Sequence, residues 1–100
     1  MSILQVKNGK VEVRKESGTL IRTFGNGEVI NADFNSDETK ILITTSKGKV
    51  EIHKDSGTLI KTIVNSEATN ARWHGNDILV TTVKGKTELR KESGILIKTM

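Results

Sequence analysis

The sequence lacks cysteine and proline, and it has only three aromatic residues among 100, namely Phe24, Phe34 and Trp73. Without cysteine, the chain can form neither a disulfide nor a thiolate zinc site, which is compatible with a reducing compartment. Hydrophobic residues make up 34% of the chain. This content is low for a self-sufficient core in one small domain. We therefore expect the chain to bury small β-branched and aliphatic side chains, or to associate with copies of itself.

Long apolar segments are also missing. The N-terminal stretch MSILQVKNGK has no basic region followed by a long apolar run, so we expect no secretory signal. No apolar run approaches the roughly 20 residues that a membrane-spanning helix needs. We therefore expect a soluble protein of the cytoplasm or of a virion, without membrane contact.

A seven-residue phrase occurs three times in this short chain. Residues 15–21 read KESGTLI, residues 54–60 read KDSGTLI, and residues 91–97 read KESGILI. The glycines of the phrase, Gly18, Gly57 and Gly94, are 39 and then 37 residues apart. The difference of two residues falls in one polar segment, FNSDETKI in one copy and WHGNDI in the next. Similarity at a fixed period in this range indicates a repeat architecture.

Each repeat has the pattern of four short strands, which we label a to d. Strand a is INADF, b is ILITT, c is KVEIHK and d is TLIKTI in the central copy. Alternating apolar and polar residues in c, and β-branched residues in b and d, favour strands over helices. Asn8-Gly9 predicts a two-residue hairpin between b and c, and Lys47-Gly48 and Lys84-Gly85 occupy the same place. The repeated phrase predicts a type I turn with a left-handed glycine and a bulge before strand d.

The stretch NADFNSDETKILITTSKGKVEIHKDSGTLIKTI resembles a blade of the WD-repeat family. The Trp-Asp pair of that family is replaced by Arg14-Lys15, His53-Lys54 and Arg90-Lys91, and its Gly-His pair is missing as well. The family's hydrogen-bonded tetrad therefore cannot be carried over. The resemblance implies an all-β fold, a β-propeller fragment of three blades in one repeat domain, residues 1–100. We expect a partial blade b-c-d in 1–24 and blades a-b-c-d in 25–63 and 64–100.

Three blades are too few to close a propeller, which normally has four to eight. We expect closure by oligomerisation, most simply as a head-to-tail homodimer with six blades, because a trimer would have nine. The first blade lacks strand a. The edge at Ile3–Val6 could accept a strand from another polypeptide, or the ring could contain three-stranded blades, or the sequence could be truncated or designed.

No residue pattern predicts catalysis, a cofactor or a metal site. His53 and His74 have no partner at ligand spacing, and the GNGE stretch at 25–28 lacks the strand-to-helix context of a phosphate loop. Repeated Ser and acidic residues belong to the turns. We therefore expect no enzyme, and a non-catalytic binding or structural module. The repeated turns also leave open a lectin-like or virion component.

Two groups of residues are candidate sites. The turns between strands b and c are lysine-rich and predict an alternative function as a nucleic-acid or polyanion binder, in a chain of net charge +4. These lysines are Lys7, Lys10, Lys47, Lys49, Lys84 and Lys86. Strand a is expected to line the channel with Asn31, Asp33, Asn70 and Arg72. We consider an Asp33–Arg72 ion pair there, or exposure of both side chains to water, and we expect Ala32, Phe34, Ala71 and Trp73 to pack between blades.

Overall fold

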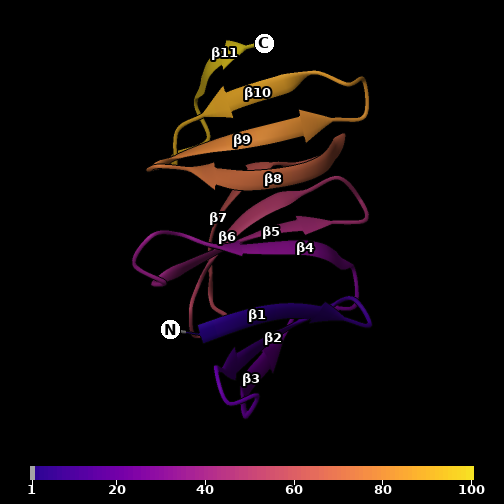
Figure 1. The fold of residues 1–100 in the computed structure, drawn as a ribbon. Helices are drawn as coiled ribbons and strands as arrows, with labels where there is room; N and C mark the ends of the chain where they lie inside the picture. The colour runs from indigo at the N-terminus through magenta and orange to yellow at the C-terminus, as the bar shows by residue number, and fades with distance from the viewer. Residues whose placement is uncertain (1) are drawn as a thin grey trace.

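The computed structural model describes residues 2–100 as eleven strands in three separate antiparallel sheets (Figure 1). The first sheet contains β1 (Ser2–Lys7), β2 (Lys10–Lys15) and β3 (Leu20–Phe24). The second contains β4 (Val29–Phe34), β5 (Lys40–Thr45), β6 (Val50–Lys54) and β7 (Leu59–Val64). The third contains β8 (Ala68–His74), β9 (Asp77–Thr82), β10 (Thr87–Arg90) and β11 (Leu96–Thr99).

The sheets follow one another along the chain, and within each sheet every strand pairs with its neighbours in sequence. Figure 1 shows them stacked in a row from the N-terminus to the C-terminus, with β4 and β8 on the same side of the stack. This arrangement confirms the predicted strand order b-c-d, a-b-c-d, a-b-c-d. In residues 2–100, no helix has the length and apolarity that crossing a membrane would require.

The turns between strands b and c differ between the first sheet and the other two. Asn8 (φ 54°) and Gly9 (φ 74°) form the predicted two-residue hairpin with positive φ at both positions. The prediction that the other two turns place two residues in the same geometry was wrong. Residues 46–49 and 83–86 form four-residue turns, in which only Gly48 and Gly85 have positive φ. A lysine at the first central position would be strained with positive φ, so the chain uses a longer turn there.

The turns between strands c and d confirm the interpretation of the repeated phrase. Gly18 has φ 93°, and its N–H donates to Lys15 O at 2.8 Å, while Lys15 N–H donates to Thr19 O at 2.9 Å. The register shifts at the same point in all three sheets, as a bulge requires. The second and third turns have the same hydrogen bonds and place Gly57 and Gly94 in the same conformation.

A basic side chain of strand c contacts the glycine carbonyl of each of these turns. Arg14 donates from Nη1 to Gly18 O at 2.7 Å and from Nε to Glu12 Oε1 at 3.2 Å. Arg90 makes the same contacts in the third sheet, with Gly94 O at 2.8 Å and Glu88 Oε1 at 3.0 Å. In the second sheet the imidazole of His53 lies 2.9 Å from both Gly57 O and Glu51 Oε1. These residues occupy the place of the missing Trp-Asp pair, and they hold the turn by a different set of bonds.

The central sheet packs against a neighbouring sheet on each of its two faces. Its strand β5 points Ile41 and Ile43 toward the first sheet, where they pack with Val11, Val13 and Val29. Leu42 points to the other side, toward the third sheet. A strand that is buried on both faces needs apolar residues in succession, which explains why KILITT does not alternate.

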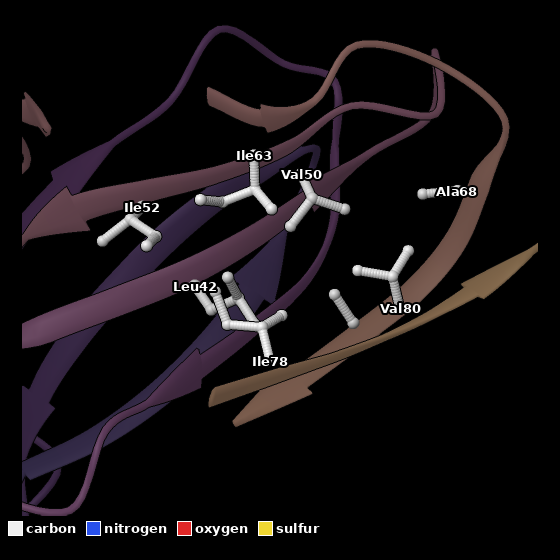
Figure 2. Packing of buried hydrophobic residues seen from close by; sticks show 8 residues of the cluster. Leu42, Val50, Ile52, Ile63, Ala68, Ile78 and Val80 are labelled. Atoms are coloured by element: carbon white, nitrogen blue, oxygen red, sulfur yellow. The ribbon is translucent and has the colours of Figure 1, made fainter. Parts of the chain in front are cut away.

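The second core cluster lies between the second and third sheets (Figure 2). It contains Leu42, Val50, Ile52 and Ile63 from one sheet and Ala68, Ala71, Ile78 and Val80 from the other. Trp73 packs against this cluster, and Ala32 and Phe34 pack against the first one. The prediction that these aromatic and alanine positions lie between blades is therefore confirmed.

Candidate functional site

The outer face of the third sheet repeats a face that is buried in the second. Leu42 and Ile52 are directly paired on β5 and β6, and both are 1% exposed because the third sheet covers them. Leu79 and Leu89 form the corresponding pair on β9 and β10. No further sheet follows in the described residues, so both leucines are only half-buried. The third sheet thus presents, on its free side, the pattern that the second sheet uses to bind its neighbour.

The outer face of the first sheet is the free counterpart at the other end of the stack. Leu4 and Val6 on β1 pack toward the second sheet, and Ile3 points the other way. Ile3 is 47% exposed, whereas Ile41 and Ile78 at the equivalent positions are fully buried. The described residues therefore end in two unlike faces, each of which has a buried equivalent inside the chain.

The turns between strands b and c lie at one end of the stack, beside the connections between sheets. Gly9 O accepts a hydrogen bond from Val29 N at 2.9 Å, and Gly48 O accepts one from Ala68 N at 3.1 Å. The six candidate lysines of these turns, Lys7, Lys10, Lys47, Lys49, Lys84 and Lys86, are all exposed. Within residues 2–100, Lys47 is the one of the six with an ion pair, from its Nζ to Glu28 Oε2 at 3.1 Å. The other five leave their charge to solvent.

Strands β4 and β8 are joined by side-chain hydrogen bonds that the sequence analysis did not predict. Asn31 Nδ2 donates to Asn70 Oδ1 at 2.7 Å and to Ala71 O at 3.1 Å. Asp33 Oδ2 accepts from Trp73 N at 3.0 Å, and Asp33 O accepts from the indole Nε1 of Trp73 at 3.2 Å. We call Asn31 and Asp33 the strand clamp, because they bind the backbone of the next innermost strand.

The considered ion pair between Asp33 and Arg72 is not formed, and that interpretation was wrong. The Asp33 carboxylate binds the backbone N–H of Trp73, while the Arg72 side chain is exposed and has no ion pair within the described range 2–100. Alternation along β8 explains this outcome. Arg72 and Trp73 point to opposite sides, so the residue that faces β4 is Trp73. Of the four residues predicted to line the channel, the structure brings Asn31, Asp33 and Asn70 together along β4 and β8 and leaves the Arg72 side chain exposed.

A pocket of about 180 Å³ lies between the first and second sheets. Its lining residues are Gly25, Asn26, Val29, Ile43, Thr45, Glu51 and His53. At the corresponding place between the second and third sheets, Val64 of β7 and Arg90 of β10 stand at the positions of Gly25 and His53, so the space arises from smaller side chains. The His53 ring lies tilted beside Phe24, with centroids 5.4 Å apart, and its two nitrogens contact Gly57 O of the turn and Glu51 Oε1 of β6. The imidazole therefore has a structural role.

Other residues of a type that can bind metals or act in catalysis are dispersed or form hydrogen bonds within their own turns. Among residues 2–100, no group of three or more His, Cys, Asp or Glu side chains could hold a metal ion. Ser17 and Ser56 lie at 3.1 and 3.4 Å from the hydroxyls of Thr19 and Thr58 in their own turns. The sequence reasoning therefore placed these serines correctly in the turns.

The repetition of antiparallel sheets side by side, two of them joined at their innermost strands β4 and β8, defines WD-repeat-like β-propeller blades. Solved structures agree. The chain is similar to BamB from Moraxella catarrhalis, with a TM-score of 0.77 and 15% identity over 99% of this chain and 32% of that one. It is similar to the C-terminal WD40 domain of Sif2, with a TM-score of 0.70 and 17% identity over 95% and 32%. It is also similar to the WD40 β-propeller domain of Doa1, with a TM-score of 0.79 and 18% identity over 98% and 36%.

These likenesses concern the fold. No family model matches the sequence, and no curated protein matches it. The chain spans about a third of the length of the three solved structures. Its three sheets therefore correspond to part of a propeller ring.

Proposed function

We propose that the chain is a non-catalytic binding or structural module in which two copies join head to tail as a six-bladed ring. The proposed blades are residues 1–24, 25–63 and 64–100. The observation that supports this proposal most directly is the outer face of the third sheet. Its Leu79–Leu89 pair repeats the Leu42–Ile52 pair that the chain buries completely between its own sheets. A second copy offers the matching partner, because its first sheet exposes Ile3 where internal interfaces bury isoleucine.

The C-terminal residue extends this match to the turns between strands c and d. A Cβ atom built on Gly57 would lie 3.0 Å from the Phe24 ring, and one on Gly94 would lie 3.5 Å from Ile63 O. Nothing lies within 4 Å of the same point on Gly18. Met100 is the counterpart of Phe24 and Ile63 in the repeat, and it is 61% exposed. Head-to-tail joining would place Met100 of one copy against the Gly18 turn of the other.

Sedimentation equilibrium at micromolar concentration tests the ring. We expect twice the chain mass of 11.0 kDa for the natural sequence and a monomer for Leu89→Lys. The matched control is Leu59→Lys, because Leu59 is 51% exposed on the outermost strand β7 and lies outside the proposed interface. It should remain a dimer. A folded monomer or a trimer for the natural sequence overturns the proposed ring.

A second function is favoured by the lysines of the b–c turns, five of which have no ion pair in the described part of the chain. Clustered free cations attract polyanions such as nucleic acid, with an affinity that falls as salt rises. Ring closure would place two such sets of lysines on one end.

The test compares two triple variants with the same change in net charge. Lys10, Lys49 and Lys86, at equivalent positions in the b–c turns, are replaced by Gln in one variant. Lys15, Lys54 and Lys91, at the opposite end, are replaced in the other. Binding to heparin and duplex DNA at low salt should be lost only in the first variant. Equal weakening in both variants, or no binding by the natural sequence, overturns this function.

A further inference from the structure

The first sheet has an open edge at β1. In the other sheets, strand b pairs with an innermost strand, β5 with β4 and β9 with β8. Strand β1 occupies the b position and pairs only with β2 in the described residues. An unpaired strand edge presents backbone N–H and C=O groups that can accept another strand.

The backbone groups that face this edge follow from the hairpin between β4 and β5. Asn35 N donates to Lys40 O at 3.1 Å, so the residues at every second position from Lys40 pair with strand a. Their counterparts on β1 are Ser2, Leu4 and Val6. The N–H and C=O groups of these residues therefore point toward the open position.

One of these groups, the N–H of Ser2, forms a hydrogen bond with a side chain instead of with a strand. In the second sheet, Lys40 N donates to Asn35 Oδ1 at 3.0 Å, which belongs to the turn after strand a. The equivalent group, Ser2 N, donates instead to Glu38 Oε1 at 2.9 Å. A side chain from the neighbouring sheet thus supplies the oxygen that, in the second sheet, comes from the turn after strand a.

Strand β4 also presents groups that a strand beside β1 would contact. The strand clamp on β4 binds Ala71 O and Trp73 N of β8. Phe34 pairs with Ile41 on β5, and Trp73 pairs with Ile78 at the equivalent place on β9. Ala32 O and Phe34 N are therefore the counterparts of Ala71 O and Trp73 N, and they face the open position beside β1. A strand beside β1 would satisfy them with an amide donor and a carboxylate acceptor two residues apart.

We infer that the open edge of β1 is the binding site of an extended partner segment with the pattern Asn-x-Asp. Backbone pairing with β1 holds the segment, as in the addition of a strand to a sheet edge. The Asn and Asp side chains hold it against β4 and select it over other extended peptides. This inference rests on the proposed binding role of the module, and it does not depend on ring formation.

The test uses a labelled peptide with the chain's own clamp sequence, EVINADFN, which corresponds to residues 28–35. We expect saturable binding in fluorescence anisotropy. Replacement by Ala of the peptide Asn and Asp that correspond to Asn31 and Asp33 should weaken binding at least about tenfold, since it removes the hydrogen bonds to Ala32 O and Phe34 N, the second of them charged.

A backbone control separates strand pairing from side-chain affinity. In β4, Asp33 pairs with Leu42 and its N–H faces β5, whereas the N–H of Ala32 faces away. N-methylation at the Asp of the peptide should therefore abolish binding, while N-methylation at its Ala should be tolerated. Equal affinities for the four peptides, or no binding of the parent peptide, overturn the inference.

Glu38→Ala provides a variant of the protein itself. It frees Ser2 N for the last Asn of the peptide, so we expect several-fold tighter binding of EVINADFN and no change for a peptide that ends one residue earlier. The mass of the chain is measured in the same samples. A dimer that does not bind the peptide refutes the Asn-x-Asp site alone, and a monomer that binds it refutes the ring alone.

Discussion

An ion pair across the sheets predicts how charge controls the assembly of two copies. Lys40 at the start of β5 pairs with Glu92 in the c–d turn of the third sheet. The repeat places Asp77 at the position of Lys40, and Glu16 at the position of Glu92. In the head-to-tail ring, Asp77 of one copy would therefore face Glu16 of the other with the same charge. Asp77→Lys would create, between the two copies, an ion pair with Glu16 like the internal pair of Lys40 with Glu92, and it should strengthen the dimer.

The expected size of this effect follows from the exposure of the internal pair. The side chains of Lys40 and Glu92 are 36% and 40% exposed, so the contact is screened by solvent, and such pairs contribute about 0.2–1 kcal/mol. Replacing repulsion by attraction should contribute about 0.5–1 kcal/mol at each interface. A closed ring has two identical interfaces, so the dimer gains about 1–2 kcal/mol and its Kd falls about 5- to 30-fold.

Sedimentation equilibrium at low and high salt measures this change. The gain should be largest at low salt and shrink when the ionic strength rises. Asp55→Lys is the matched control, because this exposed residue has the same charge change and lies in the central c–d turn, where Ser56 O accepts a hydrogen bond from Arg22 of the first sheet in the same chain. It should leave the Kd unchanged.

A double variant gives the decisive result. Adding Glu16→Lys to Asp77→Lys recreates a like-charge contact and should return the Kd to its original range, with a coupling that neither single change explains. The reasoning is refuted if Asp77→Lys leaves the dimer unchanged or weaker, or if the two substitutions act additively.

Three further predictions concern the fold and are checked by urea unfolding. Gly85→Ala should lower the free energy of unfolding by about 1–2 kcal/mol, because the new side chain must adopt a positive φ. Gly48→Ala should lower it by at least about 1 kcal/mol more, because the added Cβ would also lie 2.4 Å from the backbone nitrogen of Glu67. Equal losses of stability in the two variants would contradict this reasoning. Asp33→Ala should cost about 1.5–3 kcal/mol, the range for a charged hydrogen bond, and Asp33→Asn less, because Asn retains an acceptor. Hydrogen bonds from the Thr39 hydroxyl and backbone N–H lower the pKa of Asp37 below its ordinary value, so its ionised carboxylate stabilises the fold at neutral pH, and this effect is lost as pH falls through the lowered pKa. The unfolding midpoint of Asp37→Asn should therefore lie below that of the natural chain at neutral pH and approach it at low pH.

The strand order was predictable because two signals repeat together. Glycines with positive φ mark each c–d turn, and the apolar pattern of each strand depends on which faces are covered. These signals are local and survive in every copy. They specified the three sheets and the packing of Ala71 and Trp73 between blades.

The contacts between strands of different blades were not predictable in the same way. The pairing of Asp33 with the backbone of Trp73 depends on which side of β8 faces β4, and opposite charges at the same repeat position favoured the wrong partner, Arg72. The hydrogen bonds from strand c to the c–d turns were not predicted either, because Arg14 and His53 differ in residue type although they make equivalent contacts. A systematic comparison of each basic residue with the Glu two positions earlier could have indicated them.

The burial of both faces of the central sheet has a consequence for how the molecule opens. The two apolar clusters share this sheet and no other element, so its loss would release both neighbours, whereas either terminal sheet can detach while one cluster remains intact. Amide hydrogen exchange should therefore be slowest in β5 and β6 and fastest in β3 and β11. Such a gradient gives the chain a rigid middle with ends that can adjust to what they bind.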